Sequence, residues 1–115
     1  MKVDQSILNK LYSCEVVSVD FNFKRNTITF QLSVTETGKS KKYELFFREV
    51  ERYKVNKEWA DEDWGAISVA EIFYLPDLKK EYSINDNEKK NYDYLLDGDG
   101  FEILIKSSSV ILNEL

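Results

Sequence analysis

The chain has 115 residues, is 43% hydrophobic and 32% charged, and carries a net charge of −5 at pH 7. This length fits one domain over residues 1–115, with a core large enough to fold without metals or disulfides. The single cysteine, Cys14, excludes an intramolecular disulfide and favours a reducing, cytoplasmic location. The absence of histidine excludes Ser/His/Asp and Cys/His nucleophile arrangements, and with them most hydrolase chemistry.

The charges are divided unevenly along the chain. Residues 1–57 carry 11 Lys and Arg against 7 Asp and Glu, a net charge of +4, whereas residues 58–115 carry 5 against 14, a net charge of −9. Clustered carboxylates create a field that reaches about one Debye length, roughly 8 Å at physiological salt. The split therefore predicts an acidic docking surface for a partner with a basic surface.

A short helix and a β-hairpin are predicted at the start of the chain. Asp4 is a candidate helix N-cap, and apolar residues at positions 7, 8 and 11 have the spacing of one helical face. Apolar and polar residues alternate over 17–23 and again over 28–34, which predicts two strands, each with one wet face. The turn between them is predicted at residues 24–26, because Asn26 tolerates positive φ.

The middle of the chain is predicted to continue the antiparallel sheet. Residues 35–42 form a polar, basic segment that predicts a loop, and the alternation over 43–47 predicts a third strand. Residues 48–59 fit either a helix or a bulged strand, and the bulged strand is favoured. An acidic loop framed by two tryptophans follows over 58–65.

The last part of the chain is predicted to add more strands. These strands cover residues 66–75, 92–96, 101–105 and 110–112. Pro76 ends the first of them, and the polar residues 77–91 predict an exposed, mobile connection. The Asp-Gly pairs over 97–100 predict a hairpin turn. The fold predicted for the whole chain is mainly β or α+β, an antiparallel sheet of about six strands curled into a roll or sandwich, with a short N-terminal helix.

The acidic loop is the predicted partner-binding site. Its candidate contact residues are Trp59, Asp61, Glu62, Asp63 and Trp64. Large aromatic side chains surrounded by charge are typical of interaction hot spots, although core packing of at least one of the tryptophans is the more common use. The function that follows is a non-enzymatic protein-interaction module, with no catalytic residue, no cofactor and no metal.

Other motifs in the chain favour structural interpretations. Cys14 is followed by Glu15, which disfavours a thiolate, so a buried and inert cysteine is expected. The residues 97–100 do not fit a calcium loop, because Leu95 and Lys106 fall where the loop needs carboxylates. No phosphate-binding glycine motif is present. A membrane-spanning segment and a secretory signal are also not expected from the sequence.

One basic stretch is a candidate for nucleic-acid contact. It consists of Lys39, Lys41, Lys42, Arg48, Arg52 and Lys54, interleaved with Tyr43, Phe46, Phe47 and Tyr53. Phosphate-neutralising charge beside stacking rings is the pattern of single-strand binders. The sequence pI of about 4.8 disfavours this function, so nucleic acid is an unlikely partner.

Two alternatives from other classes stay open. A small-ligand-binding protein or carboxylate-based enzyme would place Tyr74, Tyr92 and Tyr94 around a pocket inside the curled sheet. Nucleic-acid mimicry by carboxylates needs a denser negative surface than this chain provides. Edge strands also allow a homodimer as a partner state.

A resemblance to a known family leads to the same prediction of a protein-interaction module. Leu45-x-Phe47-x-x-Val50, then Trp64-Gly65 leading into a strand, then Phe101-x-Ile103-x-Ile105 resemble the landmarks of small bacterial immunity-type proteins that neutralise polymorphic toxins, over most of residues 15–112. This resemblance implies tight binding to one toxin domain and no catalysis. The chain departs from the pattern at residues 107–109, which are three serines where a glycine-containing turn is expected.

Overall fold

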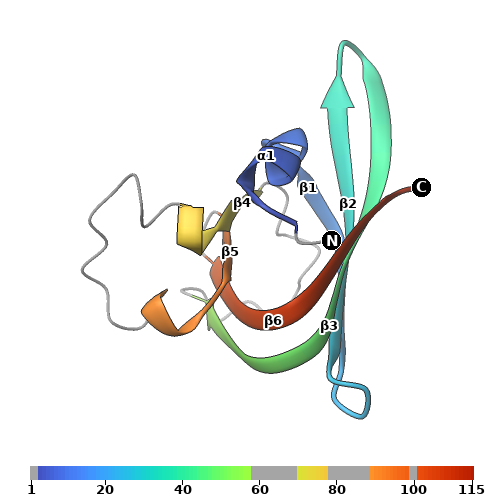
Figure 1. Ribbon diagram of the computed structural model, residues 1–115. Helices are drawn as coiled ribbons and strands as arrows, with labels where there is room; N and C mark the ends of the chain where they lie inside the picture. The colour runs from blue at the N-terminus through green and yellow to red at the C-terminus, as the bar shows by residue number, and fades with distance from the viewer. Residues whose placement is uncertain (1–2, 58–69, 78–88, 99–100) are drawn as a thin grey trace.

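A computed structural model of the chain describes residues 3–57, 70–77, 89–98 and 101–115. Its elements are α1 (Gln5–Leu8), η1 (Asn9–Leu11), β1 (Glu15–Asn22), β2 (Thr27–Glu36), β3 (Lys39–Lys57), β4 (Ala70–Tyr74), η3 (Lys89–Asn91), β5 (Tyr94–Gly98) and β6 (Phe101–Glu114). The six strands form one antiparallel sheet in the order β1-β2-β3-β6-β5-β4 (Figure 1). The predicted antiparallel sheet with a short N-terminal helix is therefore confirmed.

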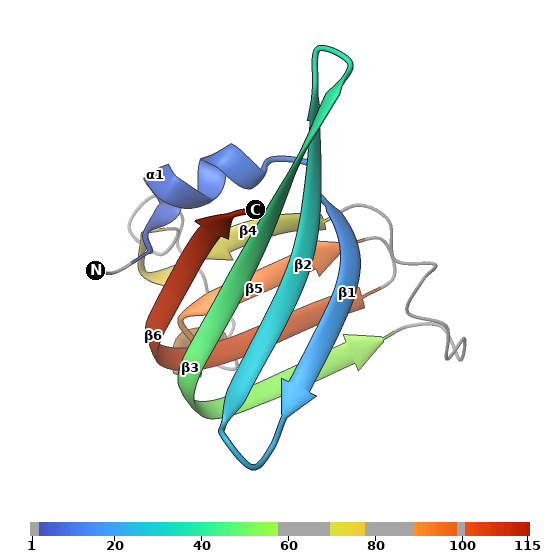
Figure 2. The same cartoon turned by 90° about the vertical axis from the view of Figure 1, so that its right-hand side faces the viewer.

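The sheet is curled but not closed. The long strands β3 and β6 bend together, so that β4 and β5 turn back behind β1 and β2 (Figure 2). The two ends of the sheet approach each other at one bridge, where the N–H of Ala70 donates to the carbonyl of Cys14 at 2.8 Å. Beyond that bridge β1 and β4 do not pair. The fold is an open roll, mostly β.

The bend in β3 confirms the predicted bulged strand. The pairing of β3 with β6 shifts register between Val50 and Arg52, which leaves Glu51 without a residue opposite it. Glu49, just before the shift, has a φ of 52°, a left-handed conformation that few side chains adopt. A bulge increases local twist and bends a strand, and this one turns β3 away from β2, whose pairing with β3 ends at Phe47.

Three consecutive serines of β6 hold this bend. The Ser107 hydroxyl is buried and donates to the carbonyl of Arg48. The Ser108 hydroxyl donates to Glu49 Oε2 at 2.6 Å, and the Arg48 guanidinium donates to Ser109 Oγ at 3.0 Å. Side-chain hydrogen bonds thus satisfy polar groups where the bulge interrupts the regular ladder.

The continuity of β6 corrects the sequence prediction, which separated 101–105 from 110–112. Serine is common in turns, so the three serines at residues 107–109 indicated a break between two strands. The structure keeps them in the strand because Arg48, Glu49 and the register of β3 give each serine a partner.

The N-terminal hairpin is confirmed, with one shift. Asn22 lies opposite Thr27, and Asn26 has the positive φ of 54° that the turn requires. The strand starts at Glu15, and a register shift between Val16 and Ser18 leaves Val17 exposed while Val16 is buried. The alternation over 17–23 therefore does not give one buried face, because the bulge moves the side chains before it to the opposite faces.

The predicted loop over 35–42 is wrong. Here β2 and β3 continue as a projecting two-stranded ribbon, seen at the top of Figure 2, and only Thr37 and Gly38 form the turn. Both turn residues have positive φ, 49° and 79°, as a two-residue hairpin turn of type I′ needs. The polar composition indicated a loop because both faces of the ribbon are exposed.

The C-terminal hairpin is also confirmed. Gly98 of β5 lies opposite Phe101 of β6, with residues 99–100 between them. A Cβ atom at Gly98 would lie 1.7 Å from the Phe101 ring, so glycine leaves the space that the ring occupies. Strand β5 starts at Tyr94 rather than at residue 92, and most of the predicted connection over 77–91 lies outside the described residues, as does the start of the strand predicted over 66–75.

The inner face of the roll carries the main core. Its largest fully buried side chains include Phe30, Phe47 and Tyr94. Phe47 contacts Phe30 and Tyr94 edge to face, with ring centroids 5.7 Å and 5.3 Å apart. A smaller cluster on the opposite face of β4, β5 and β6 contains Leu75, Leu95 and Leu104. The two clusters explain why β6 is apolar on both faces along residues 103–105.

Helix α1 covers one open end of the roll (Figure 2). Asp4 caps the helix by accepting from the N–H of Ile7 at 3.2 Å, as predicted, and Leu8 and Leu11 are buried. The Gln5 side chain reaches the edge strand β4, where it donates to the carbonyl of Ile72 and accepts from the N–H of Tyr74 at 2.7 Å. No helix in the described part of the chain is long and apolar enough to cross a lipid bilayer.

Candidate functional site

The predicted contact residues Trp59, Asp61, Glu62, Asp63 and Trp64 all lie outside the described residues. The described residues do bring together a different candidate, which sequence reasoning did not identify.

This candidate is a groove at the bend of the sheet, which we name the aromatic groove. It has a volume of about 400 Å³. Its walls come from the end of β1, the β1–β2 turn, the start of β2 and the part of β3 at and after the bend. The lining residues are Phe21, Asn22, Phe23, Asn26, Thr27, Ile28, Val50, Glu51, Arg52 and Tyr53.

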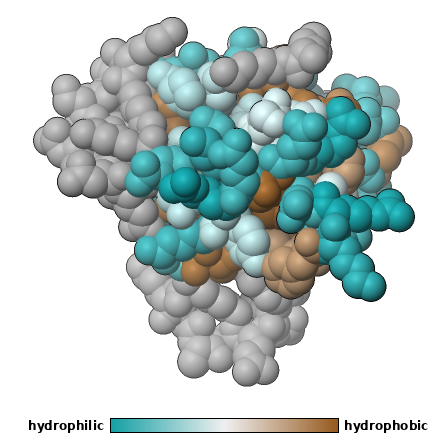
Figure 3. Space-filling model, turned by 60° about the horizontal axis from the view of Figure 1, so that its bottom comes forward, coloured by the Kyte–Doolittle hydropathy of each residue, from teal (hydrophilic) through white to brown (hydrophobic). Residues whose placement is uncertain are grey.

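Three aromatic rings meet in the aromatic groove. The Tyr53 ring lies 5.4 Å from the Phe21 ring and 6.1 Å from the Phe23 ring, centroid to centroid, and is inclined to them by 33° and 29°. Phe23 remains 71% exposed and Tyr53 38% exposed. Figure 3, which looks toward the underside of the bend, shows apolar surface between polar side chains. An exposed aromatic cluster of this kind is more informative about function than a single exposed apolar residue.

The bend in β3 creates the aromatic groove. Glu49 has a left-handed conformation, and the N–H of the next residue, Val50, donates to the carbonyl of Asn26 at 2.9 Å. Asn22 Oδ1 accepts from the N–H of Arg25 at 3.3 Å and fixes the turn from the other side. The first of these contacts joins the β1–β2 turn to β3 through a backbone hydrogen bond, and the second orders the turn itself.

The charges around the aromatic groove are mostly positive. Arg52 lines it, and Lys24 and Arg25 lie in the turn between two lining residues, Phe23 and Asn26. Within the described part of the chain, none of these three cations makes an ion pair. Glu51 is the one carboxylate among the lining residues, and its Oε2 lies 3.7 Å from Lys106 Nζ.

The tyrosines of the ligand-pocket alternative do not line a shared cavity. Tyr74 and Tyr94 are buried against each other in the main core, with ring centroids 5.3 Å apart, and the Tyr94 hydroxyl donates to the carbonyl of Val3 at 2.7 Å. Burial and nearby negative groups raise the pKa of Tyr94 above its ordinary value. Tyr92 packs with the second cluster, on the opposite face of the sheet. The structure therefore brings Tyr74 and Tyr94 together in the main core and places Tyr92 apart from them.

The basic stretch is likewise dispersed. Lys39, Lys41 and Lys42 lie on the projecting ribbon, whereas Arg52 and Lys54 follow the bend. Phe47, one of the interleaved rings, is fully buried in the main core. Of that stretch, Arg52 and Tyr53 line the aromatic groove.

Cys14 is fully buried, as expected. Burial raises the pKa of its thiol to about 11, which keeps it protonated at neutral pH. Its Sγ lies 3.5 Å from the carbonyl oxygen of Ala70. This position makes Cys14 part of the junction between the two ends of the sheet.

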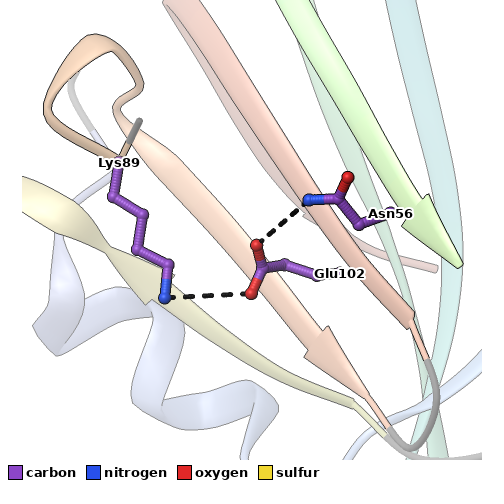
Figure 4. A network of polar contacts seen from close by, with 3 residues as sticks. All are labelled: Asn56, Lys89 and Glu102. Carbon is purple, nitrogen blue, oxygen red and sulfur yellow. Dashed lines mark hydrogen bonds and ion pairs between the residues drawn. The ribbon is translucent and has the colours of Figure 1, made fainter. Parts of the chain in front are cut away.

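Two other polar or hollow features have structural explanations. Glu102 accepts from the Asn56 amide at 3.4 Å and lies 3.8 Å from Lys89 Nζ, an arrangement that holds η3 against β6 (Figure 4). A second hollow of about 400 Å³, lined by Val3, Ile7, Lys10, Val110, Ile111 and Leu112, lies where the N-terminal segment packs on β6. Within the described residues, no group of three or more Cys, Asp and Glu side chains is arranged to hold a metal ion.

The chain was compared with known proteins. A family model described as YxiG-like protein matches residues 5–96. No match was found among the curated proteins or among the solved structures. The matched segment contains all the residues that line the aromatic groove.

Proposed function

This chain belongs to the YxiG-like family, and we propose that it is a non-enzymatic protein-interaction module whose partner is anchored in the aromatic groove. The observation that carries the proposal is the exposure of Phe23, 71%, in a groove shared with Phe21 and Tyr53. Aromatic anchors in preformed pockets supply a large share of the binding free energy of protein interfaces.

The shape of the aromatic groove supports this function. The Val50 to Asn26 hydrogen bond holds the turn against β3, and the hydrogen bond from the N–H of Arg25 to Asn22 Oδ1 orders the turn itself. A site that is already ordered loses little conformational entropy on binding, so more of the contact energy appears as affinity. The rings therefore act as fixed anchors.

The test compares capture by the wild type and by variants. The double variant Phe23→Ala, Tyr53→Ala removes the exposed aromatic anchors, and Tyr12→Ala is the matched control because Tyr12 is 72% exposed and does not line the groove. We expect one protein from a lysate of the source organism to be retained by the wild type and by the control, and lost by the double variant. The captured protein is then purified, and its Kd for the wild type and for each variant is measured. We expect the double variant to lose about 2 kcal/mol or more of binding free energy.

Equal Kd values for the wild type and the double variant would contradict the proposal. Circular dichroism and urea unfolding show whether the double variant is folded, so that a lost partner is not confused with a lost fold.

The acidic loop is a second, separate part of the proposal. Its support is the net charge of −9 over residues 58–115, which fits a partner with a basic surface. Charge reversal at Asp61, Glu62 and Asp63 is expected to slow association with the captured protein more than it lowers the free energy of unfolding. Stopped-flow kinetics at low and high salt measure the effect, and an unchanged association rate would remove this loop from the interface.

The cellular setting of the module is also proposed. The single cysteine supports a cytoplasmic location, and the resemblance to immunity-type proteins supports a toxin domain as the partner. If the captured protein is a toxin, co-expression with the wild type should restore growth and co-expression with the double variant should not.

A further inference from the structure

We infer that the occupant of the aromatic groove is an extended segment of a partner protein in which acidic residues flank an apolar side chain. This inference rests on the proposed function and specifies the chemistry of the partner. The partner segment at the groove is acidic, whereas the partner surface predicted for the acidic loop is basic, because the charges around the groove are mostly positive.

Charge complementarity identifies the acidic residues of the segment. Lys24, Arg25 and Arg52 are exposed and make no ion pair within the described residues, whereas the lining carboxylate Glu51 is paired with Lys106. The groove therefore offers one cation in its lining, Arg52, and two more in the adjoining turn, while its one lining carboxylate already has a partner. A carboxylate beside them gains charge-assisted contacts that a neutral or basic segment does not.

The rings identify the apolar side chain of the segment. Phe23 and Tyr53 present apolar surface within the groove, and burying it requires an apolar side chain between the flanking carboxylates. The volume of about 400 Å³ is near the lower end of the range for ligand clefts, so the groove admits a few side chains rather than a folded surface. An extended segment fits this space.

A single-stranded nucleic acid also combines negative charge with groups that stack on rings. The overall charge of −5 opposes the dense charge of a phosphate backbone more strongly than it opposes a segment with a few carboxylates. The observations thus favour the acidic segment, and nucleic acid becomes an outcome of the test.

The experiment selects ligands from a displayed library of random peptides, using the whole purified chain. Binders to the wild type are counter-selected against the Phe23→Ala, Tyr53→Ala variant, so that only groove-dependent peptides remain. We expect these peptides to be enriched in Asp and Glu next to Leu, Ile, Phe or Trp.

An enriched peptide is then synthesised and its Kd measured by fluorescence anisotropy with two charge variants. One carries Lys24→Gln, Arg25→Gln and Arg52→Gln, and the matched control carries Lys39→Gln, Lys41→Gln and Lys42→Gln on the projecting ribbon. Both lose three positive charges. We expect the first to raise Kd by about tenfold or more and the second by about threefold or less, because screened charges outside the groove contribute little.

The outcomes separate this inference from the proposed function. Groove-dependent peptides without acidic enrichment, or with equal Kd values in the two charge variants, would overturn the acidic segment and leave the interaction module standing. A library that yields no peptide sensitive to Phe23 and Tyr53, together with an unchanged Kd for the captured partner in the double variant, would overturn both.

Two further measurements address other occupants. Tighter binding of oligo-dT than of the selected peptide would overturn the inference in favour of nucleic acid. A dimer in sedimentation equilibrium that the Phe23→Ala, Tyr53→Ala variant dissociates would overturn it in favour of a second copy of this chain.

Discussion

Cys14 shows how one residue links chemistry to the closure of the fold. Its backbone carbonyl accepts from Ala70 at the bridge between the two ends of the sheet, and its thiol is buried at the same place. The raised pKa, about 11 against an ordinary 9.0, means that the folded chain holds the thiol proton more tightly than the unfolded chain does.

This difference predicts a loss of stability at alkaline pH. Below pH 9.0 the thiol is protonated in both states and its contribution is fully present, whereas between pH 9.0 and about 11 only the unfolded thiol ionises, so unfolding becomes easier as pH rises. Urea unfolding followed by tryptophan fluorescence from pH 7 to about 11 measures the effect. Cys14→Ala should show a smaller decline over this window, and an identical decline would contradict the account.

Thr37 has a backbone conformation that its own side chain disfavours. It holds a left-handed conformation, with a φ of 49°, although its β-branched side chain disfavours that region. The next residue, Gly38, adopts positive φ without strain.

Thr37→Asn is therefore expected to stabilise the fold by about 0.5–1 kcal/mol, because Asn-Gly is the preferred pair for this turn. The urea concentration at the midpoint of unfolding should rise, while the dependence of the unfolding free energy on urea concentration stays the same. A lower midpoint would show that the Thr37 side chain has a stabilising role that the described contacts do not include.

At the scale of elements, alternation predicted the strands wherever a regular strand has one buried face. The first hairpin, the strand through Leu45 and Phe47 and the last hairpin were all recognisable in this way. The errors fell where a ribbon projects with both faces exposed, over residues 35–42, and where the bulge at Val17 moves side chains to the other face. These features depend on neighbours in space, which a single sequence does not display.

The bend between β3 and β6 is the element on which the aromatic groove depends. Its serines appeared to separate two strands, but each of them contacts Arg48, Glu49 or the adjacent backbone. Apart from the cysteine and the tyrosines, Ser107 is the one buried polar residue among those that the structure describes.

Ser107→Ala is expected to lower the free energy of unfolding by about 1–3 kcal/mol, since the carbonyl of Arg48 would lose its buried partner. Ser108→Ala is the matched control, because its hydrogen bond to Glu49 is exposed and is expected to contribute less than about 1 kcal/mol. Urea unfolding of both variants gives the comparison. A larger loss of unfolding free energy in Ser108→Ala than in Ser107→Ala would show that Ser107 is not the main support of the bend.

At the scale of the whole molecule, the fold brings residues that are distant in the sequence together in one candidate site. Phe21 and Phe23 are separated from Tyr53 by an entire strand and a projecting ribbon, and the bend brings their rings together. The sequence contained the aromatic residues but no signal that they meet, since nothing in the local pattern fixes where β3 leaves β2. The predicted acidic loop lies outside the described residues and stays a prediction.

The two halves of the chain, which differ in net charge, form different parts of the fold. The residues that line the aromatic groove all belong to the basic half of the chain, residues 1–57, with its net charge of +4. The acidic half supplies β4, β5 and β6, which complete the roll. The lining itself carries one positive charge, Arg52, and one negative charge, Glu51, and the adjoining turn adds Lys24 and Arg25, so the excess of positive charge near the groove comes from the turn.

The most direct test of the aromatic groove is hydrogen exchange of the chain with and without its captured partner, analysed by mass spectrometry. The account predicts slower exchange on binding for amides over residues 21–28 and 50–53, with no change in the projecting ribbon over 35–42. Protection confined to the ribbon or to the second hollow, with unchanged exchange at the aromatic groove, would contradict it.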